Sequence, residues 1–175
     1  TVLNVGLTTK TVEGLAAKTR NDRFAQDSYR RFVSMFGSIV MGVPREHFEA
    51  ILKHKKTEVG VTHETHLDAR HLRELVASFK GLIKEETKKD FPDEPLEQLR
   101  MAISAVFSSW FGARAITYRR LYGIPDSWGT AVNVVAMVFG NMGETSGTGV
   151  AFTRSPSSGD KAFFGECLMN AQGED

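Results

Sequence analysis

Apolar residues recur at helical spacing through most of the first 122 residues, beginning near Asn21. In the stretch 21–42 they fall three to five positions apart, which predicts an amphipathic helix. These positions are Phe24, Tyr29, Phe32, Val33, Phe36 and Val40. Asn21 or Asp22 would cap its start, and Gly42 before Val43-Pro44 would end it. Residues 1–13 are polar and Thr-rich without a strong period, and no helix is predicted there.

Two further helices follow the same pattern. The first runs from Arg45 to about Lys56, and its apolar side is Phe48, Ile51 and Leu52. The second begins at about Asp68, a good N-cap residue. It ends in the charged stretch Lys84–Asp90, which suits a solvated helix end. Its apolar positions are Leu72, Leu75, Val76, Phe79 and Ile83.

The most regular pattern follows the breaker Phe91–Pro95, whose Pro95 suits a first helical turn. Spacings of three and four place the apolar residues on one face, which predicts one continuous helix to about Tyr122. They are Leu96, Leu99, Ile103, Val106, Trp110 and Ala113. Basic residues gather towards its C-terminal end, where the helix dipole favours cations. They are Arg114, Arg119 and Arg120.

The pattern changes to β after Gly129. Three strands are predicted at Thr130–Phe139, Gly149–Thr153 and Ala162–Asn170, with a turn at Ser155–Asp160 between the second and third. The expected fold class is therefore α+β, a helical block followed by an antiparallel β-meander.

Composition limits the class of protein. The chain has 175 residues, 41% hydrophobic and 25% charged, which is typical of one or two folded units. The net charge of +1 points to neither nucleic acid nor membrane, and no apolar stretch approaches the ~20 residues of a membrane span. Cys167 is the single cysteine, so no internal disulfide can form and a reducing, intracellular setting is expected. Its apolar surroundings predict a small core residue.

Residues 140–149 form a loop with four glycines, an Asn and hydroxyl side chains. Such a loop is either an ordinary hairpin turn or a flap whose backbone N–H groups hold a triphosphate. A P-loop is excluded because no Lys lies between Phe139 and Phe152. The dinucleotide fingerprint is excluded because Phe152 stands where its third Gly would be. A flap between antiparallel strands remains.

Long sequence blocks carry a resemblance to a known family. They include Asn21–Phe32, Ala131–Val134, Met137–Gly143, Ser146–Arg154 and Asn170–Asp175. These blocks, with Thr1–Leu7, closely resemble the pyruvate phosphate dikinases from end to end. The related phosphoenolpyruvate synthases share the architecture but fit the blocks less well.

The resemblance implies part of an ATP-grasp nucleotide domain. Residues 1–92 would be a mainly helical inserted subdomain, 93–129 a long connecting helix, and 130–175 part of the ATP-grasp β subdomain. In that family, ATP and phosphate phosphorylate a histidine on a swivelling domain of the same chain, and that domain then interconverts pyruvate and phosphoenolpyruvate. The parent would be a homo-oligomer acting in cytoplasm, plastid or glycosome.

The resemblance also implies roles for individual residues. Gly147, Thr148 and Gly149 would belong to the flap over the ATP phosphates. Met137, with Val135, would border the adenine, and Glu174 and Asp175 would be the acidic pair at the nucleotide site. Mg²⁺ would accompany ATP. Its ligands, the basic phosphate clamp and the phosphorylated histidine are expected outside these residues, so no catalytic or metal-binding residue is assigned and the chain alone is expected to be inactive.

Other polar residues have two interpretations each. Arg114, Ser157 and Glu166 are either contacts for the swivelling domain or solvated surface. The histidines His63, His66 and His71 lack metal-ligand spacing, so a surface loop is favoured over a metal site. A basic patch that binds RNA would need stacking aromatics, which Arg114, Arg119 and Arg120 lack. A different class remains open, in which the helical block is a non-catalytic interaction module, and titration of the intact domain with MgATP separates the two.

Overall fold

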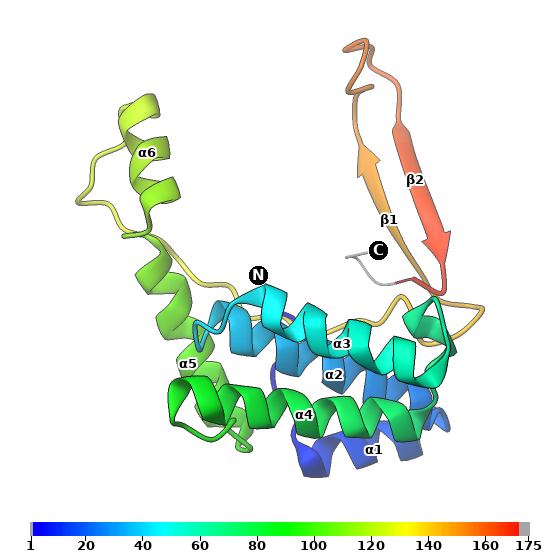
Figure 1. The fold of residues 1–175 in the computed structure, drawn as a ribbon. Helices are drawn as coiled ribbons and strands as arrows, with labels where there is room; N and C mark the ends of the chain where they lie inside the picture. Colours follow the sequence, from blue (N-terminus) through cyan, green and yellow to red (C-terminus); the bar gives the residue numbers. More distant parts are fainter. Residues whose placement is uncertain (1, 172–175) are drawn as a thin grey trace. The chain divides into compact units, whose positions relative to one another are not determined.

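The computed structural model describes residues 2–171, which form two compact units that divide after Val135. The first unit is helical and the second contains a two-stranded antiparallel sheet (Figure 1). This arrangement is the α+β class that the sequence predicts. The helices of the first unit are α1 (Thr9–Thr19), α2 (Asp22–Ile39), α3 (Arg45–Val59), α4 (Ala69–Thr87), α5 (Pro95–Ser109) and α6 (Ala113–Tyr122), with a short 3₁₀ turn η1 (Glu64–His66) before α4.

Local capping explains where the predicted helices begin. The Asn21 side chain accepts a hydrogen bond from the Phe24 N–H at 3.0 Å, which caps α2. Asp68 accepts from the His71 N–H at 2.9 Å and caps α4, and this hydrogen bond lowers the pKa of the Asp68 carboxyl. Pro95 occupies the first turn of α5. Each of these starts agrees with the sequence prediction.

Helix α1 was not predicted. Thr8 and Thr11 form a capping box, in which the Thr8 side chain accepts from the Thr11 N–H and the Thr11 side chain accepts from the Thr8 N–H. Only Val12 of this helix is buried, with Leu15 and Ala16 partly so. Three apolar positions are too few to show a helical period in the sequence. The capping box pairs Thr8 with Thr11, whereas its usual sequence signature has Glu or Gln at the second position.

The prediction of one helix from 95 to 122 is wrong. Helix α5 ends at Ser109 with Trp110 as its C-cap, and Gly112 adopts the extended angles φ −69° and ψ 148° before α6 begins. In a continuous helix the Trp110 carbonyl would accept from the N–H four residues on. Here the Trp110 carbonyl accepts a hydrogen bond from the Arg119 guanidinium at 2.5 Å. Glycine at position 112 also disfavours a helical backbone, because it loses more conformational entropy than other residues.

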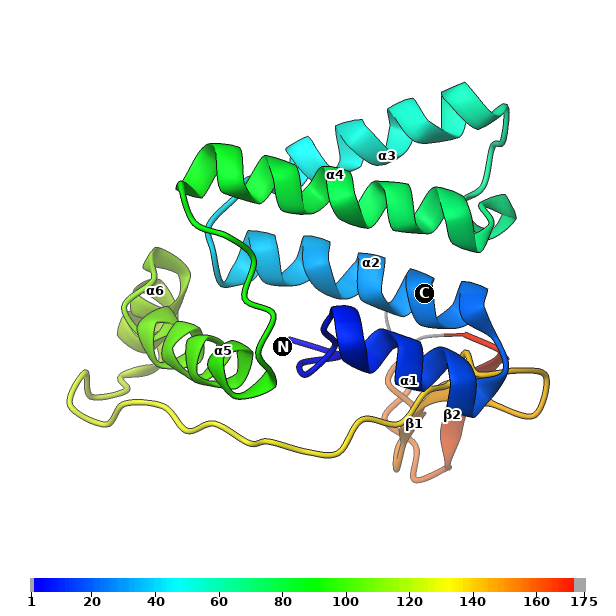
Figure 2. The same cartoon turned by 90° about the horizontal axis from the view of Figure 1, so that it is seen from below.

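The core of the first unit surrounds α2, which packs against α1, α3 and α4 (Figure 2). Phe32, Phe36 and Phe91 form a triangle of edge-to-face rings with centroids 5.4 to 5.7 Å apart. Phe48 of α3 meets Phe79 of α4 in the same way at 5.1 Å. These contacts make the helical unit a single packed core.

Charged residues of α2 anchor the turn before α4. Arg30, which is 4% exposed, pairs with Asp27 at 2.7 Å and with Glu64 at 3.1 Å. Arg23 donates to the carbonyl oxygens of Glu64 and Leu67. The polar residues between the apolar positions of α2 therefore hold the segment 64–67 in place, a role that helical periodicity does not reveal.

The second unit contains β1 (Gly147–Phe152) and β2 (Phe164–Met169). The predicted strand at 130–139 does not form, so the described residues hold a hairpin and no three-stranded meander. Val135 and Val138 are 86% and 87% exposed, and strand propensity has little effect without a neighbouring strand or a packed face. Cys167 is exposed as well, which corrects the expectation of a core thiol.

Candidate functional site

The glycines of the candidate flap lie in β1 and at its entrance. β1 pairs with β2 in antiparallel register, with Gly147 opposite Met169 and Gly149 opposite Cys167. A Cβ at Gly149 would lie 2.9 Å from the Glu166 carbonyl oxygen and 3.1 Å from the Cys167 Cβ. The two strands therefore approach more closely than a side chain at Gly149 would allow.

Gly140, the first residue of the loop, lies against Thr148 of β1 and against Ala171. A Cβ at this position would overlap the Thr148 hydroxyl and the Ala171 carbonyl oxygen. The Thr148 hydroxyl donates to that carbonyl at 2.7 Å, and Ala171 is 7% exposed. Residues 140, 148 and 171 are thus in close contact, and only glycine fits at 140.

The alternation of hydrogen bonds along the hairpin determines where the N–H groups of Gly147 and Gly149 point. The Asn170 N–H donates to the Ser146 carbonyl at 2.7 Å, which makes Ser146–Asn170 a hydrogen-bonded pair. Hydrogen-bonded and non-hydrogen-bonded pairs alternate along an antiparallel ladder. Gly147 and Gly149 therefore stand in non-hydrogen-bonded pairs, and their N–H groups point to the edge of β1 that faces away from β2.

Two backbone donors on one edge, without side chains beside them, suit an anion with several oxygens. The side chains of the hairpin add little positive charge. Its basic residues are Arg154 and Lys161, and Arg154 donates to the Gly159 carbonyl in the turn that joins the strands. The edge of β1 can therefore orient phosphate oxygens, while charge neutralisation has to come from other groups.

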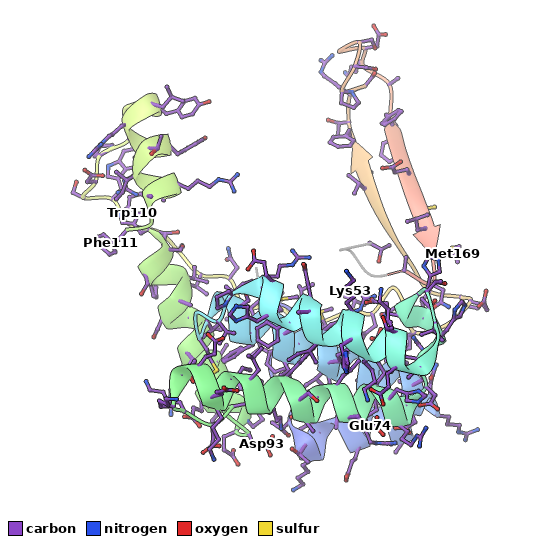
Figure 3. The ribbon with its side chains drawn as sticks, in the orientation of Figure 1. Lys53, Glu74, Asp93, Trp110, Phe111 and Met169 are labelled. Carbon is purple, nitrogen blue, oxygen red and sulfur yellow. The ribbon has the colours of Figure 1, made fainter. Side chains whose placement is uncertain are left out.

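The remaining predicted nucleotide contacts do not gather in the described residues. Met137 is 38% exposed and lies in a segment without regular secondary structure before the loop. Glu174 and Asp175 lie outside the described residues. Figure 3 labels Met169, the last residue of β2.

The three predicted docking residues are all exposed. Arg114 lies in the first turn of α6 in the helical unit, whereas Glu166 lies in β2, opposite Val150. Ser157 belongs to the turn between the strands, where its hydroxyl lies 3.1 Å from that of Ser155. Their docking role stays a prediction.

The histidines at 63, 66 and 71 have ordinary surroundings for a turn and a helix start. His63 and His66 meet edge to face with ring centroids 6.1 Å apart, and His71 lies beside Asp68. Across residues 2–171, no three His, Cys, Asp or Glu side chains gather closely enough to hold a metal ion. None of the helices in this range has the length and hydropathy that crossing a bilayer demands.

Gly140 is the site residue that sequence reasoning passed over. The sequence presents it as one loop glycine among four, because spacing alone does not tell a turn residue from one in contact with a neighbouring strand. Its separation from Thr148 along the chain gives no signal of the close approach that the structure shows.

Comparison with known proteins places these features in a family. The family model described as pyruvate phosphate dikinase, AMP/ATP-binding domain, matches residues 1–175. The chain is 57% identical over 176 residues to pyruvate, phosphate dikinase of Clostridium symbiosum. It is 53% identical over 175 residues both to the Rhizobium meliloti protein of that name and to the chloroplastic pyruvate, phosphate dikinase 1 of Arabidopsis thaliana.

All three comparisons cover the whole chain but only 18% to 20% of each relative. The chain therefore spans about a fifth of the length of these relatives. The chain belongs to the pyruvate phosphate dikinase family, within its AMP/ATP-binding domain.

Proposed function

We propose that this chain supplies the phosphate-covering flap of a pyruvate, phosphate dikinase. In the proposed reaction, ATP and phosphate phosphorylate a histidine on a swivelling domain, which then exchanges the phosphoryl group with pyruvate and phosphoenolpyruvate. The observation that carries the proposal is the edge of β1, where the N–H groups of Gly147 and Gly149 point away from β2.

The flap would act by positioning. A phosphoryl group in transfer is rich in charge and loosely bonded, so fixed donors that align its oxygens stabilise the transition state. Gly147 and Gly149 would donate to phosphate oxygens from a backbone already held by β2. Thr148 would act indirectly, since its hydroxyl is engaged with the Ala171 carbonyl and holds the start of β1 in place.

Other parts of the proposed site complete the assignment. Met137 would border the adenine, and Glu174 and Asp175 would contact the nucleotide. Mg²⁺ would neutralise the phosphates, but the described residues hold no cluster that fits the ion, so its ligands are not assigned to them. We also expect the chain alone to catalyse no phosphorylation.

Docking of the swivelling domain is the second part of the proposal. Arg114, Ser157 and Glu166 are exposed and would form its contacts. Charge reversal at Arg114 in the full-length enzyme should slow phosphorylation of the histidine without changing the affinity for ATP.

The flap is tested by a bulky residue at Gly149 in the full-length enzyme. Gly149→Val keeps the backbone N–H, but its side chain would crowd β2 and displace that donor. The ATP-dependent phosphorylation of the histidine should fall by about a hundredfold, the loss typical of losing one positioned donor. Phosphorylation of the same histidine by phosphoenolpyruvate should not change, because that half-reaction does not use the ATP site. Rapid-quench measurement of the two half-reactions gives both rates.

Gly165→Val is the matched control. A Cβ at Gly165 in β2 would lie 2.8 Å from the Val150 carbonyl oxygen, so its crowding of the hairpin is similar to that at Gly149. This variant should lose the same thermal stability and keep most of its ATP half-reaction. Equal losses of that half-reaction in both variants would mean that Gly149 is needed for the hairpin only.

A further inference from the structure

Within residues 136–171, the hairpin unit has one packed place, at the end where β1 begins and β2 ends (Figure 1). Ala171 is the only buried residue of this range, at 7% exposed. The partly buried residues of the range lie in the stretch 139–148, with Ser155 in the distant turn as the exception. The loop before β1 is therefore at the anchored end of the hairpin.

The amide of Gly147 depends on a hydrogen bond at this anchored end. A trans peptide group is planar, so its N–H and its carbonyl point in opposite directions. The Gly147 N–H points to the free edge because the Ser146 carbonyl, in the same peptide group, points inward and accepts from the Asn170 N–H at 2.7 Å. Asn170 lies just beyond the end of β2. Gly149 lies further inside the ladder, so the Gly147 amide is the one that depends on this terminal bond.

The backbone of Asn170 is left-handed and needs support from its neighbours. Its φ is 51°, a region that few residues other than glycine adopt, although Asn tolerates it better than most. Such a conformation persists where surrounding contacts determine it. On one side the Asn170 N–H bonds Ser146, and on the other the carbonyl of Ala171 accepts from the Thr148 hydroxyl at 2.7 Å. The bond between Thr148 and Ala171 thus keeps Asn170 turned towards Ser146.

Gly140 lies against this hydrogen bond, and we call the group of Gly140, Thr148, Asn170 and Ala171 the clasp. A Cβ at position 140 would overlap both atoms of the bond, the Thr148 hydroxyl oxygen and the Ala171 carbonyl oxygen. It would also lie 2.8 Å from the carbonyl oxygen of Gly147. Gly140 is not among the glycines with positive φ. The need for glycine at this position therefore comes from close approach and not from backbone angles.

We propose that Gly140 is a positioning residue of the nucleotide site and acts through the clasp on the amide of Gly147. Gly140 itself contacts no ligand. It leaves room for the hydrogen bond between Thr148 and Ala171, which holds the start of β1 in the geometry that directs the Gly147 N–H to the free edge. A phosphate oxygen would accept from that amide, so the inference rests on the proposed function of the β1 edge.

Gly140→Ala in the full-length enzyme tests the positioning role. At saturating MgATP, the rate of ATP-dependent phosphorylation of the histidine should fall by about tenfold, the effect of misdirecting one hydrogen bond to a charged group. The Kd for ATP should change by less than about threefold, because a misdirected donor matters most for the charge that develops during transfer. Phosphorylation of the histidine by phosphoenolpyruvate should not change.

Substitutions at Thr148 separate the hydrogen bond of the clasp from its packing. Thr148→Val keeps the shape of the side chain without the hydroxyl and should reproduce the tenfold loss, whereas Thr148→Ser keeps the hydroxyl and should retain the rate. The double variant Gly140→Ala, Thr148→Val should lose no more than about the same tenfold, because both changes break one bond. Thr148→Val adds no atom to the packed end, so its result decides the matter even where Gly140→Ala lowers the yield of folded enzyme.

Gly165→Ala is the matched control for crowding. A Cβ at Gly165 would also lie 2.8 Å from a backbone carbonyl oxygen, that of Val150, but outside the clasp. This variant should keep its ATP half-reaction. Equal losses in the Gly140 and Gly165 variants, additive losses in the double variant, or a normal rate in Thr148→Val would each overturn the role of the clasp.

The variant Gly149→Val distinguishes failure of the clasp from failure of the proposed function. A hundredfold loss in Gly149→Val beside normal rates in Gly140→Ala and Thr148→Val would reject the clasp and leave the phosphate-binding edge standing. Normal rates in all three variants would reject both.

Discussion

At the scale of single residues, close approach of backbones decides which positions must be glycine. In α2, a Cβ on Gly37 would lie 2.6 Å from Cζ of Phe48 and 2.8 Å from Cδ1 of Ile83. Gly37 therefore lets α3 and α4 pack their large side chains directly onto the α2 backbone. Gly81 of α4 is also helical, but a Cβ there would meet no atom within 4 Å.

The two helical glycines should respond oppositely to alanine. Gly37→Ala should lower the free energy of unfolding of the helical unit by about 1–3 kcal/mol, because the added methyl overpacks the core. Gly81→Ala should raise it by about 0.5–1 kcal/mol, because alanine favours the helix. Urea unfolding followed by circular dichroism measures both, and a stabilising Gly37→Ala would contradict the packing described for α2.

At the scale of elements, α6 depends on one polar cluster more than on apolar packing. Its buried residue is Arg119, which stacks over the Trp110 ring at 4.1 Å and donates to Asp126 at 2.6 Å. The Trp110 indole N–H donates to the Asp126 carbonyl at 3.2 Å, which ties the turn after α6 to the end of α5. Figure 3 shows Trp110 at this junction.

Loss of Arg119 should loosen α6 selectively. Arg119→Met removes two hydrogen bonds to Trp110 and Asp126 and should reduce the opening free energy of α6 by about 1–3 kcal/mol, leaving α2 unaffected. Hydrogen exchange resolved by residue measures both helices. Arg120→Met removes the neighbouring exposed arginine and should change neither, so equal effects of the two substitutions would disprove the role of the cluster.

At the scale of the whole molecule, the two units differ in how much apolar surface they bury. The helical unit encloses a continuous cluster of buried residues drawn from α1 to α5. The strands β1 and β2 leave large apolar side chains exposed, including Phe152, Phe164 and Leu168. A two-stranded hairpin without a packed face is only marginally stable in water.

Hydrogen exchange of the chain should therefore divide at this boundary. Amides in the middle of α2 should exchange more slowly than those of β1 and β2 by a factor of about 10³ or more, as expected for a cooperative core beside a marginal hairpin. Hairpin amides as protected as those of α2 would contradict this order.

The sequence predicts residues of the nucleotide site only where its motifs match those of the family. The blocks around Met137–Gly143 and Ser146–Arg154 identified the family, and predicted a flap, before any geometry was known. They did not show that Gly147 and Gly149, rather than Thr148, direct their amides outward, because this follows from pairing with β2. The roles of these residues towards ATP stay predictions.

The sequence by itself determined the helix starts at Asn21, Asp68 and Pro95, because each depends on hydrogen bonds or backbone angles within one turn of chain. It also determined the family, through residues that need no structure to be recognised. Only the tertiary structure decided where α5 breaks, that 130–139 forms no strand, and that a groove lies beside Gln26. Those outcomes depend on contacts that reach beyond one helical turn. The Arg119 guanidinium bonds the Trp110 carbonyl, residues 130–139 lack a neighbouring strand, and α1 and α4 leave space between them.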